Sequence, residues 1–251
     1  MSLVEYDAAE GVAHLRLNRP GSANAFDLPM ARAFRAAVDR AGDEPDVRAV
    51  VVSGAGARFC AGGDVASFAA AADRPAYLHR LASELDEALR ALGDLPKPVV
   101  AAVHGAVAGA GLGLLLTADV AIAAPRTTFV FAYPRIGLTP DCGVSWMLPR
   151  AVGSQRALAL ALTGRALEAT TALEWGLVAA VEDDPLRAAT VLARSWADGP
   201  AGALGRTRLL LRAAWDVDRA AAGTREAAQI AEAVRGEEAQ ELIRAFVDRT
   251  R

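Results

Sequence analysis

The hydrophobic positions of the chain alternate between two patterns, short Val-rich runs and longer stretches with an apolar residue at every third or fourth position. Val-rich runs without charge are typical of strands buried on both faces, and the second spacing is typical of amphipathic helices. Both patterns meet in the most apolar stretch, residues 98–119, where a Val-rich run passes through Gly105, Gly109, Gly111 and Gly113 into a Leu-rich run. We expect a buried strand, a tight passage of small residues and a buried helix there.

The glycines of this passage point either to chemistry or to close packing. The first N–H groups of a helix have no partner within the helix, and small residues let a ligand approach them, so a developing negative charge could bind here in an oxyanion site. Close helix packing without chemistry is the alternative. A membrane span over Val99–Ala118 is disfavoured by the glycines, by His104 and by the lack of flanking basic clusters. The glycine spacing matches neither G-x-G-x-x-G nor a P-loop.

The remaining patterns predict an alternation of strands and helices. The expected strands, of which the first two form a hairpin, cover residues 3–6, 12–17, 48–53, 98–103, 120–124, 129–131 and 176–181. The expected helices cover residues 27–41, 75–93, the segment after 111, the segment from 144, 154–163 and the chain from 185 onward. Asp27 and Ser154 are expected to cap their helices and Gly42 to end the first one. This order predicts an α/β core over residues 1–184 and a helical oligomerisation region over 185–251, whose apolar faces pack on another subunit.

Composition and charge limit the partners of the chain. With 251 residues and a formal net charge of -3, it lacks the positive excess that binds nucleic acid or an anionic membrane, and neither is expected as a partner. Its hydrophobic content of 53% is slightly above the ~45–50% of typical soluble domains, which favours self-association. Lys97 is the only lysine, so arginine supplies the other basic groups. Because the arginine guanidinium can bind a phosphate group through two N–H groups, a phosphate-bearing ligand remains possible.

Cysteine and histidine usage argues against a disulfide framework and against a metal site. Cys60 and Cys142 are too few for such a framework, and the acidic N-terminal segment does not resemble a signal peptide, so we expect a cytoplasmic protein with reduced thiols. His14, His79 and His104 share no metal-ligand spacing. No metal and no separately bound cofactor are therefore expected.

Several motifs, taken in order, resemble the enoyl-CoA hydratase/isomerase family, the crotonases, along nearly the whole chain. They are Asn18-Arg19-Pro20 with Asn24, Phe59-Cys60-Ala61-Gly62-Gly63-Asp64, Lys97-Pro98-Val99 through Gly111, Ala118-Asp119, Ile136-Gly137-Leu138-Thr139-Pro140-Asp141 and Gly176-Leu177-Val178. The resemblance implies a crotonase-like spiral of repeated ββα units with a C-terminal α-helical trimerisation region, assembled as a homotrimer or homohexamer. It also implies an acyl-CoA substrate of the kind found in fatty acid metabolism, whose thioester oxygen is held by two backbone N–H groups.

By this resemblance the two donors of the oxyanion hole fall on Ala61 and Ala110. Two preorganised donors in a dry site stabilise an enolate strongly. Ala110 departs from the family, which commonly has glycine there, and its methyl group is expected to narrow the acyl pocket. Asp64 suits a helix cap or a support of its loop, and Trp146 suits core packing, better than either suits substrate contact. The positions expected to bind substrate are Ala23, Ala61, Gly62, Gly63, Asp64, Ala110, Tyr133 and Trp146.

The acid–base groups depart most from the family pattern. Typical hydratases carry one glutamate on the helix after the glycines and a second before the Ile-Gly segment, and these positions are Gly113 and Tyr133 here. The remaining candidate is Asp141, which matches the aspartate that some isomerases and the aryl-CoA dehalogenases of the family carry. Its loop is expected to be buried against apolar neighbours such as Ile136 and Trp146. An N-cap of the following helix is its alternative role.

One carboxylate is enough to take a proton from an acyl chain and return it two carbons away. The sequence therefore predicts an enoyl-CoA isomerase with Asp141 as acid and base and with Ala61 and Ala110 as oxyanion donors. A hydratase that uses Asp141 with an ordered water stays open, as does a dehalogenase or hydrolase in which Asp141 attacks an acyl carbon. A catalytically silent acyl-CoA binder is the alternative from a different class.

Overall fold

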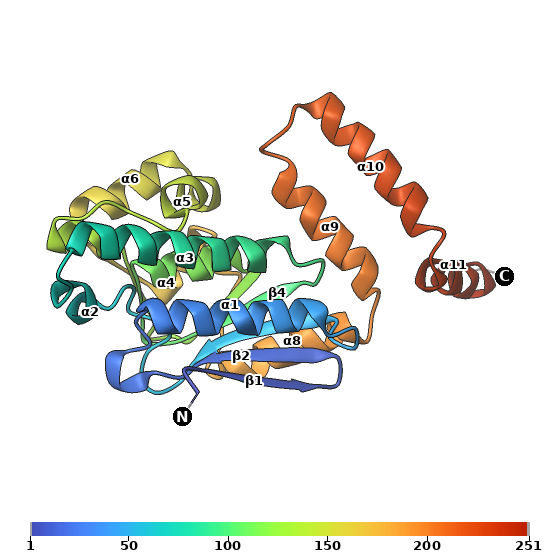
Figure 1. Cartoon of the computed structure of the whole chain (residues 1–251). Helices are drawn as coiled ribbons and strands as arrows, with labels where there is room; N and C mark the ends of the chain where they lie inside the picture. The colour runs from blue at the N-terminus through green and yellow to red at the C-terminus, as the bar shows by residue number, and fades with distance from the viewer. Residues whose placement is uncertain (1, 250–251) are drawn as a thin grey trace.

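The computed structural model describes residues 2–249 as a core of two sheets and several helices, with further helices extending from one side (Figure 1). The strands are β1 (Val4–Ala9), β2 (Val12–Leu17), β3 (Ala49–Gly54), β4 (Val99–Val103), β5 (Ala106–Ala108), β6 (Val120–Ala123), β7 (Thr128–Val130), β8 (Ala166–Glu168) and β9 (Ala180–Val181). The larger sheet has the order β1-β2-β3-β4-β6-β9 and the smaller one β5-β7-β8. β1 and β2 form the expected antiparallel hairpin, and the other pairs of the larger sheet are parallel.

The expected helices begin and end close to the predicted positions, but two residues expected at helix boundaries, Gly42 and Ser154, do not have the predicted roles. They are α1 (Leu28–Asp43), α2 (Val65–Ala69), α3 (Arg74–Asp94), α4 (Ala110–Thr117), α5 (Val144–Val152), α6 (Ser154–Thr163), α7 (Ala169–Glu174), α8 (Pro185–Ala197), α9 (Ala201–Ala213), α10 (Arg219–Ala233) and α11 (Glu237–Arg249). Asp27 caps α1 as predicted, since its carboxylate accepts the Met30 N–H at 2.8 Å. Gly42 does not end α1 but lies inside its last turn. Ser154 is not a cap either, because Gly153, at a φ of 84°, separates α5 from α6.

The two faces of the larger sheet are covered by different helices, because side chains alternate along a strand. Val50 and Val52 of β3 pack in one hydrophobic cluster with Phe34 of α1. Val51 packs in a second cluster with Ala189 of α8. α8 is therefore part of the core, and the predicted core boundary at residue 184 is too early by one helix.

The apolar stretch at 98–119 forms the centre of the core. β4 is fully buried and α4 is nearly so, as expected, while the passage between them holds the additional short strand β5. Gly105 makes the sharp turn at a φ of 61°, and a Cβ atom there would lie 2.1 Å from the carbonyl oxygen of Ala57. Among residues 2–249, no helix is both long and apolar enough to cross a membrane. The expected strand at 176–181 is shorter and begins only at Ala180.

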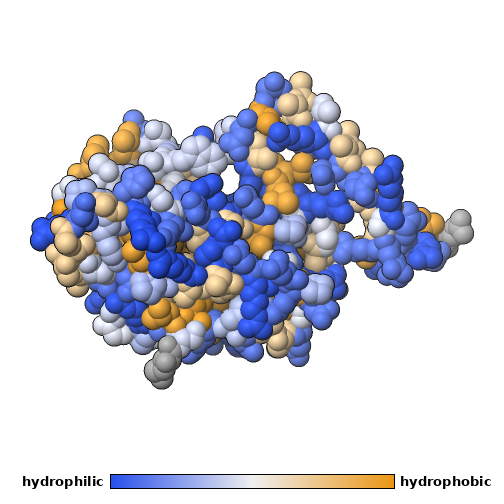
Figure 2. Space-filling view, in the orientation of Figure 1, coloured by the Kyte–Doolittle hydropathy of each residue, from blue (hydrophilic) through white to orange (hydrophobic). Residues whose placement is uncertain are grey.

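The helices α9, α10 and α11 extend away from the core as a C-terminal tail, which we define as residues 201–249 (Figure 1). A buried ion pair attaches α9, because the Arg208 Nε donates to Oδ2 of Asp119 at 2.6 Å. Hydrophobic surface follows α9 on the side seen in Figure 2. Leu211, Trp215 and Ile230 of the tail and its connections are each about 70% exposed, at 69%, 70% and 72%. A cleft of about 1000 Å³ separates α9 from α3 and α5.

Candidate active site

Two loops meet where the neighbouring parallel strands β3 and β4 end. The loop after β3 includes residues 60–64, and Cys60 forms an isolated parallel bridge with Val107 of β5. A Cβ atom on Gly62 would lie 2.9 Å from the carbonyl oxygen of Ala108 and 3.4 Å from the nitrogen of Ala110. The glycine at 62 therefore lets the loop lie directly against the N-terminus of α4.

The hydrogen bonds of this loop correct one predicted oxyanion donor. The Ala61 N–H donates to the carbonyl oxygen of Ala23 at 3.0 Å, so it is already occupied. Gly63 instead forms an isolated parallel bridge with Phe26, in which the Asp64 N–H donates to the Phe26 carbonyl at 2.8 Å. Such a bridge uses the groups on either side of Gly63 and turns its own N–H the other way.

The Gly63 N–H is thus the donor candidate of this loop. Among residues 2–249 it has no hydrogen-bond acceptor, and a Cβ atom on Gly63 would meet nothing within 4 Å. The N–H of Gly62 faces the Cys60 sulfur, which removes that neighbour from consideration. Ala61 was the wrong residue because its N–H is used to hold the loop against residue 23.

The second donor candidate is Ala110, as predicted. It is the first residue of α4 and only 2% exposed, and its cap residue Gly109 offers no side-chain acceptor. The first N–H groups of a helix are unpaired within it and lie at the positive end of its dipole. Since Gly62 contacts this helix start, the N–H groups of Gly63 and Ala110 lie at one site.

Asp64 supports the loop, which agrees with its predicted structural role. Its carboxylate caps α2 by accepting the Ala66 N–H at 3.0 Å and forms an ion pair with Arg19 at 2.7 Å. Burial alone raises the pKa of Asp64, but hydrogen bonds from Arg19 and Ser67 outweigh it and hold that pKa below its usual value. The carboxylate is therefore charged and engaged with protein groups.

Asp141 is held by a tyrosine at the position of a missing acid. The Tyr133 hydroxyl donates to Oδ1 of Asp141 at 2.7 Å. Tyr133 is only 8% exposed, and burial together with the neighbouring Asp141 raises its pKa far above the usual value. The predicted alternative, an N-cap on α5, is wrong, because the cap position is Gly143 and has no side-chain hydrogen bond.

The loop that carries Asp141 packs directly on α4. A Cβ atom on Gly113 would lie 2.9 Å from the Cβ of Cys142 and 3.0 Å from its carbonyl oxygen. Gly113 lies three residues after Ala110, which is ~4.5 Å along a helix. The loop that holds Asp141 therefore contacts α4 about one helical turn from the donor candidate Ala110. Cys142 already fills the space that a side chain at position 113 would need.

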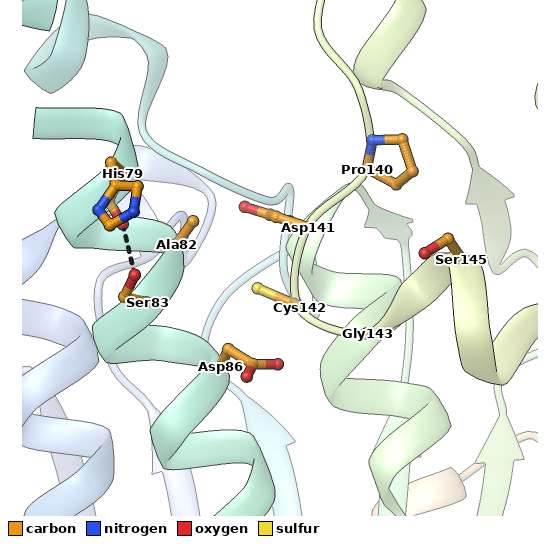
Figure 3. A pocket seen from close by; sticks show the side chains of 9 residues that line it. All are labelled: His79, Ala82, Ser83, Asp86, Pro140, Asp141, Cys142, Gly143 and Ser145. Atoms are coloured by element: carbon orange, nitrogen blue, oxygen red, sulfur yellow. Dashed lines mark hydrogen bonds between the residues drawn. The ribbon is translucent and has the colours of Figure 1, made fainter. Parts of the chain in front are cut away.

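Figure 3 shows a cavity of about 350 Å³ between α3 and this loop. His79, Ser83 and Asp86 of α3 lie on one side, and the Asp141 carboxylate extends toward them from the other. Asp141 could be proposed from the sequence, whereas the α3 residues could not. Their helical spacing of three and four was the available signal, since it places them on one face of α3.

Two residues expected around Asp141 lie elsewhere. Trp146 is 43% exposed and Ile136 51% exposed, so the loop is not buried against them, and the core role favoured for Trp146 is wrong as well. The Arg150 guanidinium lies 3.8 Å from the centre of the Trp146 ring, and both residues line the larger cleft toward α9.

The two thiols are protonated, and of the histidines His79 lines the cavity opposite Asp141. Burial raises the pKa of Cys60 to about 12 and also raises that of Cys142, so both thiols stay protonated, as small buried residues do. His14 lies 2.7 Å from the Ser53 hydroxyl, far from the two donors in sequence. Within residues 2–249, no group of three or more His, Cys, Asp or Glu side chains is placed to hold a metal ion.

The whole arrangement has a counterpart in known proteins. Residues 7–251 match the family model for enoyl-CoA hydratase/isomerase. The chain belongs to this family. Its α/β fold is the crotonase fold with C-terminal helices, since it superposes on the crystal structure of an enoyl-CoA hydratase from Polaromonas with a TM-score of 0.93 at 29% identity, covering 98% of this chain and 97% of that one.

Two curated relatives show the range of activities in this family. The chain is 42% identical over 202 residues to a probable enoyl-CoA hydratase of Mycobacterium tuberculosis, covering 80% of this chain and 78% of the relative. It is 38% identical over 221 residues to the 1,2-epoxyphenylacetyl-CoA isomerase of Escherichia coli, covering 85% and 83%. The chain is thus an enzyme of a family that processes CoA thioesters and includes both hydratases and isomerases.

Proposed function

We propose that the protein is an enoyl-CoA isomerase that moves a double bond from the 3,4 to the 2,3 position of an acyl chain. The observation that carries this proposal is the Asp141 carboxylate, with Tyr133 bonded to one of its two oxygens, in a chain where Gly113 and Tyr133 stand at the two positions at which typical hydratases carry glutamates. Gly113 supplies no second acid, and its side-chain space is filled by Cys142. The site has the group for one proton transfer at a time, and the double-bond shift needs no more.

In the proposed mechanism, Asp141 removes a proton from carbon 2 of the 3-enoyl thioester. The electron pair of that C–H bond delocalises into the thioester and the double bond, which gives a dienolate whose oxygen accepts hydrogen bonds from the N–H groups of Gly63 and Ala110. The protonated Asp141 then returns the proton to carbon 4, and a double bond forms between carbons 2 and 3. No water and no further reactant is consumed.

Hydration is the second candidate, favoured by the name of the Mycobacterium tuberculosis relative. It requires a water molecule to be activated and a proton to be delivered to carbon 2, which two carboxylates usually share. Asp86 lines the cavity on the opposite side from Asp141 and is the acid that such a reaction would recruit.

The two candidates are separated by comparing a 3-enoyl-CoA and a 2-enoyl-CoA of equal chain length with the purified protein. We expect absorbance of the conjugated thioester to appear with the first substrate and to fall much more slowly with the second. Rapid hydration without isomerisation would contradict the proposal. Asp86→Asn is the matched variant, because it removes the acid that hydration would recruit, so any hydration that depends on Asp86 should fall while the proton transfer by Asp141 continues.

We also propose that the tail, residues 201–249, packs on neighbouring subunits in a homotrimer or homohexamer. Ile230 on α10 is 72% exposed, and burying this apolar side chain against a partner subunit would be energetically favourable. Light scattering should give a trimer or hexamer, and Ile230→Glu should weaken it. Ala228→Glu on the opposite side of α10 is the control, and a monomer at micromolar concentration would contradict the proposal.

A further inference from the structure

Tyr133 is built into the site more firmly than a space-filling residue would require. Its ring stacks edge-to-face on Phe131 with centroids 5.2 Å apart, and it begins the 3-10 turn η2 (Tyr133–Ile136). Its hydroxyl donates to Oδ1 of Asp141 at 2.7 Å. A buried tyrosine hydroxyl needs a partner, and here that partner is the acid of the proposed reaction.

The hydrogen bond also persists across the working pH range. The pKa of Tyr133 is raised by burial and by Asp141, so the hydroxyl keeps its proton and stays a donor. The backbone of the loop is held as well, because the Val144 N–H donates to the Asp141 carbonyl at 3.1 Å and Cys142 packs on Gly113. The backbone and Oδ1 of Asp141 are therefore both held, and the neighbouring Cys142 thiol adds a side-chain hydrogen bond to the same carboxylate.

We propose that Tyr133 is a positioning residue that holds the Asp141 carboxylate toward the acyl chain and keeps the water of a hydration reaction out of the site. This inference rests on the proposed isomerase function and names what makes the site selective for it. A carboxylate that must take a proton at one carbon and return it at another has to keep one orientation through both steps. The Tyr133 hydroxyl, fixed on Oδ1, provides that orientation.

The test is Tyr133→Phe, which keeps the ring and removes the hydroxyl. Tyr6→Phe is the matched control. Tyr6 lies on β1, away from the site, and its hydroxyl also donates to a carboxylate, Oε2 of Glu44, at 2.8 Å. For Tyr133→Phe we expect the kcat of isomerisation to fall about ten-fold or more, as for loss of a hydrogen bond to a charged group, with KM nearly unchanged. Tyr6→Phe should change neither.

A second measurement tests the hydrogen bond between Tyr133 and Asp141 without measuring turnover. In a Tyr6→Phe, Tyr77→Phe background, Tyr133 is the remaining tyrosine, so 3-fluorotyrosine labelling gives one fluorine resonance in the NMR spectrum. Asp141→Asn should shift that resonance in the folded protein if the two side chains are bonded. Wild-type isomerisation together with unchanged kcat and KM in Tyr133→Phe would overturn the inference while leaving the proposed function intact. An unshifted resonance would overturn it independently of activity, whereas absence of wild-type isomerisation would refute the proposed function.

Discussion

Gly113→Ala tests how tightly the loop of Asp141 is packed on α4. The added methyl group would lie 2.9 Å from the Cβ of Cys142, 3.0 Å from the Cys142 carbonyl oxygen and 3.3 Å from Cδ1 of Leu89. The first two distances are shorter than ordinary contacts, and one of them is to backbone, which cannot rotate away. The loop must therefore move by a few tenths of an ångström, and Asp141 moves with its neighbour Cys142.

The expected change in stability is the difference of two opposing effects. Overpacking of a well-filled core costs ~1–3 kcal/mol. Replacing glycine by alanine inside a helix returns about 1 kcal/mol. We therefore expect a net loss of about 1 kcal/mol, or ~2–4 °C in Tm for a chain of this length. The shift of Asp141 should lower kcat about 3- to 10-fold, which is similar in free energy to the effect on stability.

The assay is thermal and denaturant unfolding together with kcat for isomerisation. Gly223→Ala in α10 is the matched control, because its methyl group would meet only the flexible end of Arg219, and it should be neutral or stabilising. Cys142→Gly should rescue part of the loss in the double variant, since it removes the 2.9 Å contact and tolerates the φ of 53° at that position. Unchanged Tm and kcat in Gly113→Ala would refute the packing argument.

Two further predictions concern the carboxylates of the site. Asp141→Asn should bind CoA thioesters and unfold at the same temperature as the wild type. Its kcat should fall at least ~100-fold, because the amide cannot accept the substrate proton. Calorimetry and the isomerisation assay check this, and retained turnover would contradict it. Asp64→Asn keeps an oxygen that caps α2 but loses the ion pair with Arg19. Because the folded pKa of Asp64 lies below its unfolded value of about 3.9, its stabilisation is complete above that pH and is lost as pH falls through the folded pKa. The wild type should therefore be more stable than Asp64→Asn at about pH 7 and lose this advantage below about pH 4, as denaturant midpoints will show; a pH-independent difference would contradict the assignment.

Much of the site follows from local patterns that the sequence displays directly. The Val-rich runs determine β3 and β4, and neighbouring parallel strands must bring their ends to one edge of the sheet. The caps at Asp27 and Asp64 depend on atoms within three residues, so they could be predicted. The family resemblance likewise rests on short motifs whose order is visible in the chain, and it predicts roles for Asp141 and Ala110.

Only the tertiary structure decided which groups are free to act. Ala61 and Gly63 are both backbone donors in one loop, and their difference arises from pairing with residues 23 and 26, far away in sequence. Tyr133 reaches Asp141 because the irregular turn between them folds back, a geometry that no periodic pattern encodes. The missing side chain at Gly113 is explained by Cys142, a contact across 29 positions. Hydrophobic periodicity determines which face of an element is buried, whereas the direction of a single N–H or carboxylate depends on long-range contacts that the periodicity does not contain.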